Sequence, residues 1–153
     1  LNVQVVRVFG ERKSAGFKIS NERGEKIASI DLSIRQNRFC KSYISYVNGV
    51  VIKGASLSKM LSDKIYAISS GNVCRRTKDV LDIYVMSFIM KIDADELHQI
   101  WKESGRVLGD FKEYKIRFSE LEEAYGKMKG IKNKPDFIEV YNRVSDIVHM
   151  FEI

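Results

Sequence analysis

The stretch DKIYAISSGNVCRRTKDVLDIY, residues 63–84, decides how this chain is interpreted. It holds the end of one predicted helix, a Gly71-Asn72 break and the start of a second helix. At about 100° per residue, Lys64 lies about 20° from Leu57, on the apolar face of the first helix. A charged side chain on a buried face costs several kcal/mol unless an opposite charge meets it. The stretch is therefore a candidate functional site. Lys64 either extends to solvent or meets an anion.

The second predicted helix starts near Thr77 and combines charge with an apolar body. In residues 80–90 only Asp82 and Ser87 are not apolar, so we expect this helix to be buried. Asp79 and Asp82 are three residues apart and share a face. Asp79 also lies in the first turn, where the helix dipole favours a carboxylate.

Two interpretations of these carboxylates stay open. In the first, Asp79 caps the helix and Asp82 pairs with a nearby arginine such as Arg75 or Arg76. In the second, both carboxylates serve a site together with Lys64. Asp82 lies one turn inside the helix, which capping does not explain.

Asp31 is a third candidate residue. In residues 27–34 the side chains of Ile30, Leu32 and Ile34 share one face of a predicted strand, and Asp31 faces the other way. A solvent-facing aspartate would show the same pattern. Two-metal phosphoryl transfer, however, uses carboxylates on strands to hold Mg²⁺.

The wider pattern predicts an α+β fold. Residues 1–55 form the β-rich part, with strands around 3–9, 17–19 and 27–34 and a hairpin at Asn48-Gly49 between 43–47 and 50–53. Residues 56–153 form the helical part, with helices at about 56–70, 77–91, 93–105 and 111–128 and a last one after Pro135. We therefore expect a small, mostly antiparallel sheet followed by a helical bundle. The apolar stripe of the last helix is predicted to be core: Phe137, Val140, Tyr141, Val144, Ile147, Val148 and Phe151.

The composition of the chain bears on its partners and its compartment. Lys and Arg number 26 against 20 Asp and Glu, a net charge of +6 that favours polyanionic partners such as nucleotides and RNA. No segment reaches the about 18 apolar residues that span a bilayer. The two cysteines have no metal-ligand spacing, so we expect a reduced, cytoplasmic protein. The chain starts at Leu1 without Met, which predicts that a natural N-terminal part is missing.

Other polar residues receive a structural interpretation. His98 and His149 lack ligand spacing and are expected at the surface or the core boundary. The lysines of residues 127–134 precede Pro135 and are interpreted as a solvated charge run that could touch RNA.

The order of these elements resembles the nucleotidyltransferase AbiEii/AbiGii toxin family of the polymerase-β-like superfamily. The resemblance covers residues 27–90: the strand IASIDLSI, the helix SLSKMLSDKIYAI and the segment RRTKDVLDIY. It implies that Asp31 supplies a metal-site carboxylate. It also implies a nucleotide-binding set of Lys64, Arg76 and Lys78, and catalytic roles for Asp31, Lys64, Lys78, Asp79 and Asp82.

The resemblance also implies a chemistry. The expected reaction is Mg²⁺-dependent transfer of a nucleotide from an NTP to an acceptor such as tRNA, by a toxin paired with an antitoxin in abortive infection. Lys64 and Lys78 would neutralise the phosphates, while Asp79 and Asp82 would orient those cations or the acceptor. The family's Gly-Ser turn and Asp-x-Asp strand have no counterpart here, since no Asp precedes Asp31. The sequence thus corresponds to the C-terminal portion, which we do not expect to catalyse by itself.

Two alternatives come from other functional classes. One is a non-catalytic nucleotide- or RNA-binding module that uses the same basic pocket, with affinity that falls steeply as salt rises. The other is a protein-interaction domain in which the charged residues pair internally. In that domain, a Lys64→Ala substitution would change stability alone.

Overall fold

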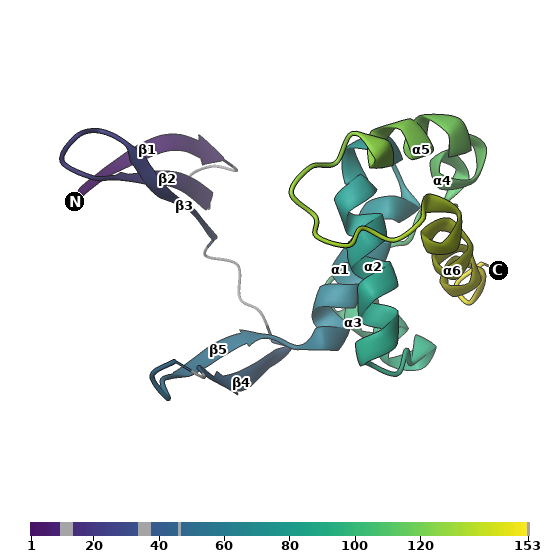
Figure 1. The fold of residues 1–153 in the computed structure, drawn as a ribbon. Coiled ribbons are helices and arrows are strands. Elements are labelled where there is room, and N and C mark those ends of the chain that lie inside the picture. Colours follow the sequence, from purple (N-terminus) through teal and green to yellow (C-terminus); the bar gives the residue numbers. More distant parts are fainter. Residues whose placement is uncertain (10–13, 34–37, 46, 153) are drawn as a thin grey trace. The chain divides into compact units, whose positions relative to one another are not determined.

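The computed structural model describes residues 1–9, 14–33, 38–45 and 47–152 of the 153-residue chain. The chain divides into two compact units, Leu1–Arg38 and Phe39–Ile153. Strands come first and helices follow, so the fold is α+β, as the sequence predicted (Figure 1).

The first unit contains a three-stranded antiparallel sheet with the order β1-β2-β3. Its strands are β1 (Asn2–Phe9), β2 (Ser14–Ser20) and β3 (Lys26–Ser33). Cross-strand rows such as Val5, Phe17 and Ile30 align apolar residues on one face. The alternating residues, among them Lys18 and Asp31, lie on the other face. The predicted two-faced strand pattern is therefore confirmed within β3, while Ile34 lies outside the described residues.

The next two strands form a separate hairpin within the second unit. β4 (Cys40–Ile44) pairs antiparallel with β5 (Val51–Ala55). The turn contains Asn48-Gly49, as predicted, and Gly49 has a φ of 69°, a conformation that glycine adopts without steric cost. At the base of the hairpin the Ser56 N–H donates to the Phe39 carbonyl oxygen over 2.8 Å. Phe39 packs against the hydrophobic core, which ties the hairpin to the helices.

The helical part follows the predicted order. The elements are α1 (Leu57–Ser69), the 3₁₀ helix η1 (Val73–Arg76), α2 (Thr77–Ile89), α3 (Ala94–Glu103), α4 (Lys112–Ile116), α5 (Phe118–Gly126) and α6 (Phe137–His149). Side-chain caps start three of the α-helices, because Ser56, Asp93 and Asp136 each accept a backbone N–H of the first turn. The region predicted at 111–128 is divided at Arg117 into α4 and α5.

One hydrophobic core joins these helices. α2 packs against α1 and α6, and α1 also contacts α3 and α4. Leu61 and Ile65 of α1, Val80 and Ile83 of α2 and Val144 of α6 are fully buried. The predicted stripe of the last helix is core as expected, apart from the partly buried Tyr141.

The prediction that residues 80–90 form a helix buried all round is wrong. Val85 is 48% exposed, and Phe88 and Ile89 are each 63% exposed. α2 contacts α1, η1, α5 and α6, yet Val85, Phe88 and Ile89 stay exposed within this unit, so its neighbours leave part of the helix surface uncovered. None of the helices in the described ranges has the length and apolar character required to cross a bilayer.

Candidate functional site

The turn between α1 and α2 is built by local polar contacts. Gly71 has a φ of 81°, the left-handed conformation that commonly ends a helix. The Asn72 side-chain oxygen then accepts the Cys74 N–H over 3.1 Å at the start of η1. The Thr77 hydroxyl donates to the Cys74 carbonyl oxygen over 2.8 Å. These contacts lead the chain from η1 into α2, which packs against α1.

Lys64 on α1 meets two carboxylates of α2. Its Nζ lies 3.0 Å from Asp79 Oδ1 and 2.6 Å from Asp82 Oδ2. The side chains of Lys64, Asp79 and Asp82 are 26%, 21% and 35% exposed, so the cluster is half-buried and open to solvent. Arg76 Nη1 lies 3.7 Å from Asp79 Oδ2 at the edge of the cluster. Of the two possibilities for Lys64, the second holds: it meets an anion.

The cluster keeps Lys64 charged. Burial lowers the pKa of Lys64, but hydrogen bonds to Asp82 and Asp79 and the charges of both carboxylates raise it by more, so the pKa is raised above 10.5. With Arg76 included, two cations face two carboxylates and the formal charges balance. Each carboxylate therefore holds a cation, which leaves the group without surplus charge.

Two other predicted residues form no ion pair with this cluster within the described residues. Lys78 is exposed on α2, and its side chain forms no ion pair within the described residues. Asp31 belongs to the Leu1–Arg38 unit, where both of its carboxylate oxygens accept Arg7 Nη2 over 3.1 Å. The α1–α2 cluster thus combines Lys64, Arg76, Asp79 and Asp82.

A glycine makes the Arg7–Asp31 pair possible. Arg7 on β1 and Asp31 on β3 both lie opposite Gly16 of the central strand. A Cβ at Gly16 would lie 2.8 Å from Arg7 Cγ and 2.9 Å from Asp31 Oδ1. The side chains of Arg7 and Asp31 are 56% and 67% exposed, so the pair lies on the solvated face of the sheet.

These residues do not by themselves form a metal site. Within the ranges that the structure describes, there is no group of three or more His, Cys, Asp or Glu side chains that could hold a metal ion. Asp79 and Asp82 are held by Lys64, and Asp31 is held by Arg7. The carboxylates present therefore do not fit the Mg²⁺ implied by the resemblance, and no chemical step is assigned to it.

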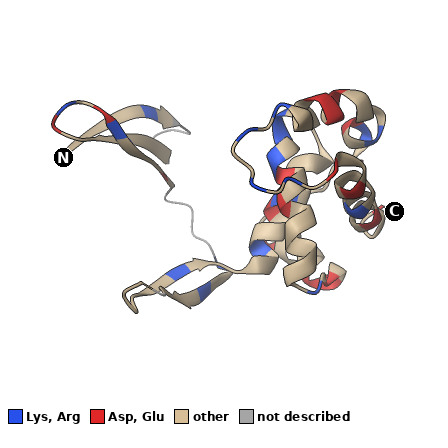
Figure 2. Cartoon of the chain, in the orientation of Figure 1, with Lys and Arg blue, Asp and Glu red and all other residues tan. Residues whose placement is uncertain are grey.

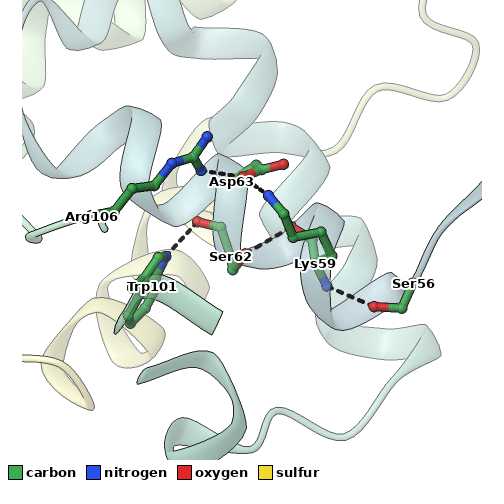
Figure 3. A network of polar contacts seen from close by, with 6 residues as sticks. All are labelled: Ser56, Lys59, Ser62, Asp63, Trp101 and Arg106. Atoms are coloured by element: carbon green, nitrogen blue, oxygen red, sulfur yellow. Dashed lines mark hydrogen bonds and ion pairs between the residues drawn. The ribbon is translucent and has the colours of Figure 1, made fainter. Parts of the chain in front are cut away.

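A second polar network, which was not predicted from the sequence, is centred on Asp63, one residue before Lys64 (Figure 3). Asp63 Oδ1 contacts both Lys59 Nζ, at 2.5 Å, and the guanidinium of Arg106. The Trp101 indole N–H donates to the Ser62 carbonyl oxygen over 2.9 Å. The four-residue spacing of Lys59 and Asp63 could have revealed their pair. Arg106 is separated by 43 positions, and no local pattern predicts that contact.

Positive and negative residues are interspersed along the helices of the second unit (Figure 2). Comparison with protein-family models, with curated proteins and with solved structures finds no match to the chain. A functional assignment therefore depends on the residues and the geometry described above.

Proposed function

We propose that the chain is the nucleotide-binding portion of a nucleotidyltransferase-like toxin of a toxin–antitoxin or abortive-infection system. In this proposal Lys64 receives the phosphates of an NTP. The observation that carries it is the contact of Lys64 Nζ with both Asp79 and Asp82, at 3.0 Å and 2.6 Å. These are the positions that the resemblance assigns to the nucleotide and catalytic pocket, on helices that pack together.

Partner exchange explains how a paired lysine could bind a nucleotide. A triphosphate carries more negative charge than a carboxylate and offers more acceptor oxygens, so it competes well for an ammonium group. Asp82 is the more exposed of the two carboxylates, at 35%, and can turn into water when a phosphate replaces it. Lys64 then keeps Asp79 as a partner, so its half-buried charge is never left alone.

Neighbouring cations extend the proposed phosphate site. Arg76 lies at the edge of the cluster. Its side chain is 56% exposed, and its Nη1 lies 3.7 Å from Asp79 Oδ2. A guanidinium suits phosphate oxygens because its donors form a planar fork. Lys78 is exposed two residues further along. Both cations are therefore available for the outer phosphates.

The remaining parts of the reaction belong to the same proposal. Transfer to an acceptor such as tRNA, with the Mg²⁺ that accompanies it in the family, is proposed on the resemblance alone, since the described carboxylates do not complete a metal site. An antitoxin is the proposed protein partner, and the proposed compartment is the cytoplasm. A nucleotide- or RNA-binding module without catalysis would use the same cations.

The balanced charges favour a second candidate, a protein-interaction module. Lys64, Arg76, Asp79 and Asp82 satisfy one another, as expected of a structural cluster. In this alternative the cluster joins α1 to α2 and binds no ligand.

Equilibrium binding of each NTP, with and without Mg²⁺, separates the two candidates. The variants are Lys64→Met, which removes the central cation, and Lys127→Met, which removes an exposed lysine paired with Glu123. The proposal predicts that Lys64→Met weakens NTP binding by roughly ten- to hundredfold, the value of a charge-assisted hydrogen bond. Lys127→Met should bind as the wild type does. If no NTP binds the wild-type chain, or if both variants bind equally, the interaction module is the better account.

A further inference from the structure

The β4–β5 hairpin ends in exposed aliphatic side chains. Five residues around its Asn48-Gly49 turn are each more than half exposed, and we call them the hairpin tip: Ile44, Val47, Val50, Val51 and Ile52. Val47 is the most exposed of them, at 94%. Aliphatic side chains that gather on an exposed surface commonly mark a site of contact with a partner.

The aliphatic residues of the tip lie on both faces of the hairpin. Ile44 is paired with Val51, and the next pair is Tyr43 with Ile52. Because successive residues of a strand point to opposite faces, these two pairs lie on opposite faces. A helix or a sheet of another protein packs on one face of a hairpin, whereas a fluid apolar layer surrounds both. The tip therefore suits the apolar boundary of a lipid surface.

The peptide groups of the turn are bonded within the hairpin. The Ser45 N–H donates to the Val50 carbonyl oxygen and the Gly49 N–H donates to the Ser45 carbonyl oxygen, each over 2.9 Å. The Val47 N–H donates to Ser45 Oγ over 3.4 Å, and the Val50 N–H donates to Asn48 Oδ1 over 3.2 Å. Peptide groups that leave water need such partners. The turn can therefore enter a lipid surface without leaving these N–H groups unbonded.

Two lysines lie behind the tip. Lys41 on β4 and Lys53 on β5 are exposed, and neither forms an ion pair within the described part of the chain. The sequence has no Asp or Glu between Asp31 and Asp63. The hairpin of residues 40–55 thus carries two positive charges and no negative one, which favours an anionic partner.

The spacing of the lysines matches the layers of a lipid surface. Lys53 comes three residues after Val50, and a strand rises by about 3.3 Å per residue, so Lys53 lies roughly 10 Å behind the turn. Elements that bind at an interface bury their apolar residues about 5–10 Å into the boundary of headgroups and acyl chains. With the tip at that depth, lysine side chains reach the level of the lipid phosphates.

We propose that the β4–β5 hairpin binds an anionic lipid surface. The tip enters the interface, and Lys41 and Lys53 meet the lipid phosphates. The contact is peripheral, since no helix in the described ranges can cross a bilayer. The proposal goes beyond the proposed nucleotide site and does not depend on it, because no residue of the hairpin belongs to the Lys64 cluster.

Co-sedimentation of the intact chain with lipid vesicles tests the proposal. The vesicles contain phosphatidylcholine alone or with about 30% phosphatidylserine, and we expect at least about tenfold tighter binding to the anionic ones. Val47→Asp places a negative charge at the tip and should weaken this binding by at least about tenfold. Val107→Asp is the matched control, because Val107 is an 86% exposed valine outside the hairpin, and it should bind as the wild type does.

A substitution that strengthens binding gives a second test. Tryptophan favours the interface of a bilayer, so Val47→Trp should bind anionic vesicles at least about threefold more tightly than the wild type. The proposal is overturned if the wild-type chain binds neither kind of vesicle, or if it binds both equally. It is also overturned if Val47→Asp and Val107→Asp have the same effect, or if single-stranded poly(U) RNA binds the chain while anionic vesicles do not.

Discussion

Lys64 Nζ lies 2.6 Å from Asp82 Oδ2, and this contact joins two helices across 18 positions of the sequence. Asp79 accepts a second hydrogen bond from the same ammonium group. Both carboxylates lie on α2, and Lys64 lies on the apolar face of α1. The contact therefore satisfies a charge that the helix pattern had placed beside the core, and it creates the proposed phosphate site.

Replacing Lys64 by methionine should reduce stability. The substitution keeps the apolar stem but leaves two half-buried carboxylates without their shared cation, so we expect a loss of about 1–2 kcal/mol in the free energy of unfolding. Urea unfolding measures it. Lys127→Met removes a pair whose side chains are 73% and 67% exposed, and it should leave the free energy of unfolding close to the wild-type value. Equal losses in the two variants would show that the Lys64 contacts add no particular stability.

The contribution of Lys64 to the free energy of unfolding should decrease at alkaline pH. The pKa of Lys64 is raised in the folded protein above its ordinary value of 10.5, despite burial, by the hydrogen bonds and charges of Asp82 and Asp79. The stabilisation is therefore fully present below pH 10.5 and is lost as the pH rises through the folded-state pKa. The difference in unfolding free energy between wild type and Lys64→Met should stay constant up to about pH 10 and shrink above it.

Tyrosine titration does not interfere with this comparison. The pKa values of Tyr84, Tyr114 and Tyr125 are also raised, but these residues are the same in both proteins and their effects cancel. If the difference in unfolding free energy between wild type and Lys64→Met grew above pH 10, the charge of Lys64 would not be the source of the stabilisation.

Asp31→Asn should have little effect on stability. Its pair with Arg7 lies on an exposed sheet face, and exposed ion pairs contribute at most about 1 kcal/mol. Urea unfolding should therefore show a change below about 1 kcal/mol. A loss well above about 1 kcal/mol in Asp31→Asn would mean that Asp31 has a structural role beyond its exposed pair with Arg7.

Gly109→Ala should destabilise the loop of residues 105–111, which is hydrogen-bonded to Ser69 of α1. A Cβ at this position would lie 2.2 Å from the Ser69 carbonyl oxygen, a backbone atom that cannot move alone. We expect a loss of at least about 2 kcal/mol, measured by thermal or urea unfolding. Gly126→Ala is the control, because its Cβ meets nothing within 4 Å, and it should gain up to about 1 kcal/mol. Equal stability of the two variants would contradict the described path of residues 105–111.

Local sequence patterns predicted the elements well. The Gly71-Asn72 break and the Asn48-Gly49 turn act within a few residues, so they mark the ends of helices and strands without knowledge of the tertiary fold. Helical periodicity also placed Lys64 on a buried face, where it does meet carboxylates.

Contacts between distant elements were less predictable. The exposure of Phe88 depends on which helices reach α2, and periodicity carries no such information. The partners Arg7 for Asp31 and Arg106 for Asp63 are fixed by strand register and by a loop path. The hollow beside Trp101 is lined by residues between 98 and 115 and by residues 151–152, and residue spacing gave no sign that these two parts of the chain meet.

A crystal structure of the chain with a non-hydrolysable NTP tests the central claim most directly. The account predicts a phosphate oxygen at about 3 Å from Lys64 Nζ, with the Asp82 carboxylate turned into solvent and Asp79 still in contact. A nucleotide bound elsewhere, with Lys64 still held by both Asp79 and Asp82, would contradict it and leave the cluster a structural role alone.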